Sequence, residues 1–187
     1  METAQVVALV AFTLVAIVVT LGARRTGSIL SRTREAEGFR GDIADLARRA
    51  ETSLGDVAIV IDGVRRRNAE PETIAPSLAA ARDAVERYAG EARAMAPPTI
   101  ALPHRDAIVY ELERAGRALD LVAHGCALYE TGRRIERGTE ADTAVKRGYL
   151  NLIHARESIA EQAKVAIERA KDASPVRRIQ RRSTDGA

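Results

Sequence analysis

Residues 108–129, IVYELERAGRALDLVAHGCALY, carry the most regular apolar pattern in the chain. Apolar side chains recur there with alternating gaps of four and three residues, at Ile108, Leu112, Ala115, Leu119, Val122, Cys126 and Tyr129. Because residues three and four apart share one face of an α-helix, this spacing predicts a helix with a buried stripe. Alternating gaps also favour the coiled-coil-like packing of four-helix bundles, whose helices cross at about 20°.

Three further stripes with helical spacing lie on either side of this segment. They run from Phe39 to Val64, from Leu78 to Met95 and from Val145 to Ala170. The last stripe is weaker than the others, because Arg156 interrupts it and its second half is mostly Ala. The pattern predicts an all-α fold in which residues 28–173 form an antiparallel four-helix bundle.

Turn-forming residues separate the predicted helices. Asn68 and Pro71 mark the first turn, the Pro97–Pro98 pair marks the second, and the loop GRRIERG at 132–138 marks the third. The segment 139–142, TEAD, has the spacing of a capping box, so we expect the fourth helix to begin there. Short connections place consecutive helices side by side in opposite directions.

Composition supports a helical protein. The chain has 187 residues, which suits one domain with an appendage, and it holds four Tyr, two Phe and no Trp. Ala, Leu, Ile and Val must therefore fill the core. The excess of Arg over Lys, together with the many Ala, is typical of a GC-rich bacterial genome. The single cysteine excludes an intramolecular disulfide and is compatible with a reducing compartment.

The segment 4–22, AQVVALVAFTLVAIVVTLG, has no charged side chain. A helix of this length reaches about 28 Å, close to the roughly 30 Å hydrocarbon core of a bilayer. Its Val, Leu, Ile and Phe residues favour insertion by about 3 to 7 kcal/mol. We interpret residues 1–27 as a single transmembrane anchor with a basic flank, in preference to a cleaved signal peptide or a buried core helix.

Basic residues follow the apolar segment, at Arg24, Arg25, Arg32 and Arg34, and none precedes it. Positive charge marks the cytoplasmic side of a membrane span. We therefore expect a single-pass plasma-membrane protein with its N-terminus outside and its C-terminal domain in the cytoplasm. The bilayer is then a partner of the chain.

The segment 174–187 is predicted to be a basic, disordered tail. It contains four arginines, Arg177, Arg178, Arg181 and Arg182, and one acidic residue. Such a tail attracts anionic lipid weakly, and without aromatic residues we do not expect it to bind nucleic acid specifically.

No catalytic, cofactor-binding or metal-binding signature is present in the sequence. The three histidines lack the Glu-x-x-His pairs of di-iron bundles, and Gly-rich phosphate loops and nucleophile elbows are absent. Cys126 falls in the apolar stripe and is expected to be a small buried side chain. We predict neither catalytic residues nor a cofactor. Gly116, Gly125 and Gly148 lie within the predicted helices. A close helix approach or a ligand would explain them, and tolerated sequence drift explains them equally well.

The sequence leaves three functional hypotheses open. The first is a membrane-anchored, non-enzymatic scaffold or interaction protein that docks a protein partner or a second copy. The second is a sensory or ligand-binding bundle, whose candidate ligand or partner face lies between the third and fourth helices. Four residues of mixed chemistry would line that face: His124, Tyr129, Tyr149 and His154. The third, an enzyme that uses the same residues, has the least support.

Overall fold

A computed structural model of the chain describes the backbone of residues 2–131 and 135–173, and the side chains of residues 33–129 and 138–173. These residues form four α-helices and two short 3₁₀ helices, and no strand is found among them. The elements are α1 (Glu2–Arg65), η1 (Pro71–Ile74), α2 (Ala75–Ala94), η2 (Thr99–Ala101), α3 (Leu102–Thr131) and α4 (Ile135–Asp172). The all-α prediction is confirmed.

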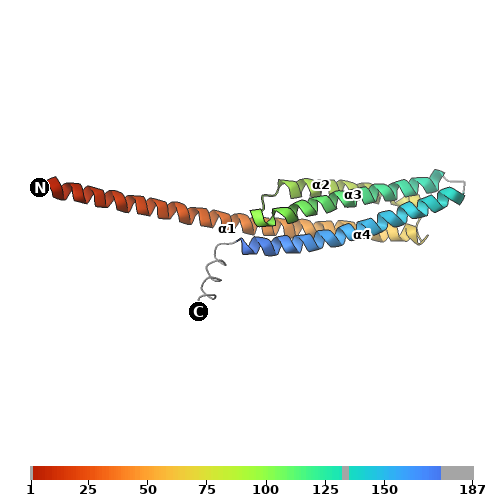
Figure 1. Ribbon diagram of the computed structural model, residues 1–187. Coiled ribbons are helices and arrows are strands. Elements are labelled where there is room, and N and C mark those ends of the chain that lie inside the picture. The colour runs from red at the N-terminus through yellow and green to blue at the C-terminus, as the bar shows by residue number, and fades with distance from the viewer. Residues whose placement is uncertain (1, 132–134, 174–187) are drawn as a thin grey trace, which may run out of the picture.

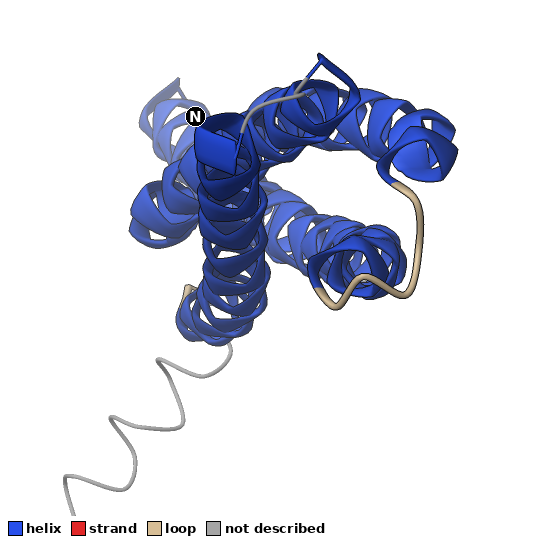
Figure 2. Ribbon diagram, turned by 90° about the vertical axis from the view of Figure 1, so that its right-hand side faces the viewer, coloured by secondary structure: helices blue, strands red, loops and turns tan. Residues whose placement is uncertain are grey.

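The helices run alternately up and down, so that each packs against its neighbours in the chain (Figure 1). α4 closes the bundle by packing against α1. The contact between α3 and α4 is the most extensive, and that between α1 and α2 is much smaller. Loops join α1 to α2 and α2 to α3 (Figure 2). The N-terminal part of α1 projects beyond the bundle, whereas α4 ends beside α1 where α1 enters it (Figure 1).

The core is filled by the predicted stripes. Its largest fully buried side chains are aliphatic and come from all four helices and η1: Ile43, Leu46, Leu54, Ile61, Ile74, Val85, Ile108, Leu112, Leu119, Val122, Leu152 and Ile159. No polar or charged residue is buried among those whose side chains are described. Burial of apolar surface is therefore the main force that holds the helices together.

Two glycines bring α3 and α4 into close contact. A Cβ atom added to Gly148 of α4 would lie 2.5 Å from Val122 Cγ2 and 2.8 Å from the carbonyl oxygen of Ala118 on α3. A Cβ atom added to Gly125 of α3 would lie 2.8 Å from Val145 Cγ2 on α4. Because such distances are too short for a real side chain, close helix approach explains both glycines.

The turn after α1 is a Schellman motif with an arginine in the position that glycine usually takes. Arg67 has φ 61°, in the left-handed region. Its backbone N–H donates to the carbonyl oxygen of Val64 (2.9 Å), and that of Asn68 donates to Gly63 (2.8 Å). This arrangement ends α1 and sets the direction of the chain towards Pro71.

Two details differ from the sequence prediction. α4 begins at Ile135, so Thr139 lies inside the helix, where it is the backbone acceptor for Thr143 (2.8 Å), and the predicted capping box is wrong. Arg156 does not interrupt the core stripe, because the neighbouring Ala155 takes the buried position. The structure also shows that the N-terminal apolar segment and the first bundle helix belong to one continuous helix, α1.

None of the helices over the described side chains, 33–129 and 138–173, is long and apolar enough to cross a membrane. The segment 4–22 lies outside those side chains, although its backbone belongs to α1. The transmembrane anchor therefore stays a prediction.

Alanine substitution should have opposite effects at a tightly packed glycine and at an exposed one. We expect Gly148→Ala to lower the free energy of unfolding by about 1–3 kcal/mol, because the new methyl group overpacks the α3–α4 contact. Gly90 lies exposed on α2 with no atom within 4 Å of an added Cβ. Gly90→Ala should raise stability by about 0.5–1 kcal/mol, because alanine restricts the unfolded chain. Urea unfolding of the full chain in detergent, followed by circular dichroism, measures both, and equal effects would contradict the close approach.

The left-handed turn also makes a prediction. We expect Arg67→Gly to stabilise the protein by about 0.5–1 kcal/mol, because glycine adopts this conformation without a steric cost. The variant loses an ion pair with Asp142 (3.5 Å). Both partners are exposed, so this pair contributes little to the stability of the protein. Arg66→Gly is the matched control and should destabilise, because the φ of Arg66 is not positive and glycine there only adds conformational freedom to the unfolded chain. Thermal unfolding measures both, and a destabilised Arg67→Gly variant would rule out the proposed strain.

Candidate functional site

The residues of the predicted face between the third and fourth helices do not share one site, and each has its own surroundings. The Tyr129 hydroxyl donates a hydrogen bond to the carboxylate of Asp142, which also pairs with Arg67. Tyr149 instead lies under the guanidinium of Arg65, 5.0 Å from Cζ to the ring centroid. Both tyrosines therefore contact the end of the bundle where α1 terminates.

The two histidines of that predicted face lie apart from these contacts. His124 is exposed on α3, and His154 Nδ1 lies 3.9 Å from Glu157 on its own helix. Among the described side chains, no hydrogen bond, ion pair or ring contact joins His124, Tyr129, Tyr149 and His154 to one another. A role for this face in binding a ligand or partner stays a prediction.

The environment of Tyr129 changes its acidity. Burial raises the pKa of its hydroxyl group, and the hydrogen bond to Asp142 adds to this effect, giving a pKa of about 12. The carboxylate of Asp142 accepts the phenolic proton and repels a tyrosinate charge. Tyr129 is thus a neutral donor that joins α3 to α4.

The remaining predicted residues are placed as follows. Arg34 is exposed at the start of the described side chains. The side chains of Arg24, Arg25 and Arg32 lie outside the described residues, as does the whole tail with Arg177, Arg178, Arg181 and Arg182. Cys126 is buried with 6 % of its surface exposed, which confirms the prediction of a buried thiol.

One cavity opens between α2 and α3. It has a volume of about 320 Å³, and Leu78, Leu119 and Cys126 line it. Arg82 and Asp120, which also line the cavity, form an ion pair with 3.1 Å between Nε and Oδ1. An apolar space of this size is at the lower limit for a small-molecule site.

A larger groove follows the outer seam between α1 and α4. It has a volume of about 660 Å³, and four of the residues that line it are alanines: Ala44, Ala47, Ala160 and Ala163. Ala163 is buried and Ala47 is half-buried, whereas Ala44 and Ala160 are exposed on the two walls. Small side chains leave room for the backbone of another helix to approach closely.

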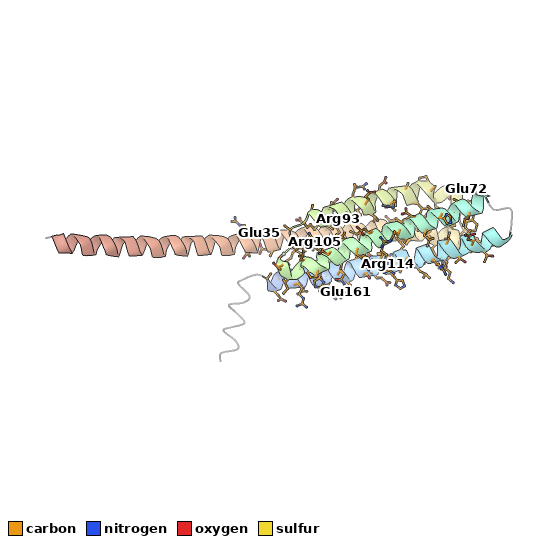
Figure 3. The ribbon with its side chains drawn as sticks, turned by 45° about the horizontal axis from the view of Figure 1, so that its top comes forward. Glu35, Glu72, Arg93, Arg105, Arg114 and Glu161 are labelled. Atoms are coloured by element: carbon orange, nitrogen blue, oxygen red, sulfur yellow. The ribbon has the colours of Figure 1, made fainter. Side chains whose placement is uncertain are left out.

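Charged side chains border this groove. Arg48 and Glu51 stand on the α1 wall, and Glu157, Glu161 and Lys164 stand on the α4 wall. Glu161 lies at the outer edge of the bundle on α4 (Figure 3). Arg156 crosses the seam and pairs with Glu51, with 3.3 Å between Nε and Oε1, and so closes one end of the groove. An alanine floor between charged walls is suited to an amphipathic α-helix.

This groove could not be identified from the sequence. Its signal is the pairing of small residues three apart on two separate helices, Ala44 with Ala47 and Ala160 with Ala163. On a single helix, that spacing cannot be distinguished from ordinary core alanines. Only the pairing of α1 with α4 makes the pattern a surface feature.

Comparison of the chain with protein-family models, with curated proteins and with solved structures finds no match. Among the described side chains, no group of three or more His, Cys, Asp and Glu residues is placed to hold a metal ion. We therefore base a functional proposal on the geometry of the groove.

The acidity of Tyr129 can be tested by titration. We expect one component of the tyrosinate absorbance to titrate near pH 12, the pKa of Tyr129, and to disappear in Tyr129→Phe. The folded-state pKa exceeds the unfolded value of about 10, so the stabilisation from Tyr129 is complete below about pH 10 and is lost as the pH rises towards 12. Asp142→Asn should lower this pKa. If the component survives Tyr129→Phe, while Tyr110→Phe removes it, the assignment is wrong.

Proposed function

We propose that the chain is a membrane-anchored, non-enzymatic interaction protein whose α1–α4 groove docks an α-helix of a protein partner. The observation that carries this proposal is the alanine-floored groove with charged walls. Docked helices bury small and apolar residues at the centre of the contact and keep charges at the rim. The groove has both features, and its length follows the helix axes.

The anchor is the second part of the proposal. The segment 4–22 is uncharged and long enough to span the hydrocarbon core as a helix. It forms the projecting end of α1 (Figure 1), where no other helix covers it. An uncharged apolar helix of this length favours insertion into lipid.

The geometry of α1 would define the distance between membrane and bundle. Thirteen residues lie between Gly22 and Ala36, the first buried side chain of the described bundle. At about 1.5 Å per residue, this segment is roughly 20 Å long. With the basic residues Arg24 and Arg25 at the cytoplasmic surface of the plasma membrane, the bundle would stand in the cytoplasm above the headgroups.

The cavity between α2 and α3 favours a second candidate function. A small apolar molecule would fit there, with the Arg82–Asp120 ion pair at its side. This place differs from the predicted face between the third and fourth helices, where the glycine contacts bring the backbones together. Ligand binding by the bundle is therefore retained as the alternative, at this cavity.

The groove can be blocked without disturbing the core. Ala160 is exposed on the α4 wall, so Ala160→Trp should fill the groove and leave the fold intact. Full-length chains that carry two different tags are expressed together, sedimented with membranes, extracted with detergent and captured through one tag. We expect a stoichiometric partner, either the second tagged copy or another protein, to be reduced at least about tenfold by this substitution.

The control is Ala80→Trp, which places the same side chain on an exposed position of α2. It should leave capture unchanged. Equal recovery from Ala160→Trp and Ala80→Trp would exclude the groove as the docking site. Recovery of the chain in the soluble fraction without detergent would exclude the anchor.

A further inference from the structure

The two walls of the groove are aligned by the antiparallel packing of α1 and α4. Glu51 lies level with Arg156, to which it is paired (3.3 Å). At the other end, Ala36 and Asp172 line the same cavity. Residues with decreasing numbers on α1 therefore lie beside residues with increasing numbers on α4. One turn from the Glu51 pair, Arg48 lies at the level of Ala160, between Glu157 and Glu161.

The charges at this level differ between the walls. Arg48 is a basic side chain on the α1 wall, 75 % exposed, and its described ion pair is with Asp45 on its own helix. On the α4 wall, Glu157 is 66 % exposed, and its carboxylate lies 3.9 Å from His154 Nδ1. Glu161 is exposed and makes no hydrogen bond or ion pair among the described residues. At this level, one wall presents a basic group and the other presents acidic groups.

An anchor at one end of α1 limits how two copies can meet. Because each copy would enter the same membrane through its own α1, the two bundles stand parallel, and a two-fold axis between them runs along the helices. That axis places the α1 wall of one copy opposite the α4 wall of the other and keeps the levels unchanged. Arg48 of each copy then faces Glu161 of the second copy.

We propose that the groove is the self-association surface of this chain, in which two parallel copies dock their α1–α4 seams face to face. Arg48 of each copy pairs with Glu161 of the other across the two-fold axis. The charges favour a second copy as the occupant, because the two-fold axis forms the Arg48–Glu161 ion pair twice in one dimer. The inference rests on the proposed anchor for its parallel arrangement.

Charge reversal tests this pairing. Full-length protein is labelled with donor or acceptor dyes and reconstituted in liposomes, and energy transfer between copies measures association. We expect Arg48→Glu and Glu161→Arg each to weaken association by about tenfold or more, because like charges then face each other twice. The double variant Arg48→Glu/Glu161→Arg should recover the wild-type association.

A mixture of the two single variants gives the sharpest result. Arg48→Glu copies and Glu161→Arg copies should each associate poorly alone and should associate with one another, because both ion pairs re-form only in the mixed dimer. Arg87→Glu, an exposed charge reversal on α2, is the control and should behave like the wild type. Circular dichroism is used to check that every variant keeps its helices.

Three results would overturn the inference: a monomeric wild type, single variants that associate as well as the wild type, or a mixture without recovery. Other measurements test the proposed function independently of self-association. Membrane sedimentation reports the anchor, and the loss of another captured protein in Ala160→Trp reports docking by a different partner. A groove that binds such a protein while charge reversal has no effect would leave the proposed function in place and reject self-association.

Discussion

The close approach of α3 and α4 is the constraint on which the rest of the bundle depends. Gly125 and Gly148 each leave space for the backbone of the facing helix, so the two longest fully bundled helices form a tight pair. Side chains on the other faces of this pair then define where α1 and α2 can pack. Because the contact involves backbone atoms on both sides, a small side-chain adjustment cannot replace it.

The position of α1 follows from what this pair leaves available. Its apolar stripe fills the core, and polar contacts hold its two flanks. On the α2 side, Arg49 pairs with Glu91, with 2.5 Å between Nη2 and Oε2, and its guanidinium lies over the ring of Tyr88. This pairing lowers the pKa of the Glu91 carboxylate. On the α4 side, alanines and the Arg156–Glu51 pair leave a groove in place of a closed interface.

Periodicity predicted the four helices, their order and most of the core, because a stripe such as Ile108 to Tyr129 depends only on local spacing. Features that need two helices at once were not predictable in the same way. Gly148 was compatible with either a ligand or a close approach until Val122 was placed opposite it. The start of α4 was misjudged because TEAD has the letters of a capping box, whereas the helix continues through it from Ile135.

The continuity of α1 has a mechanical consequence. A single helix runs from Glu2 to Arg65, without a loop between the projecting end and the residues buried in the bundle. An α-helix resists twisting, since each turn is fixed by the hydrogen bonds of the next. A rotation of the projecting end about its own axis would therefore turn Ile43 and Leu46 within the core and move the α1 wall relative to α4. A torque applied to the projecting end of α1 would therefore be transmitted to the groove.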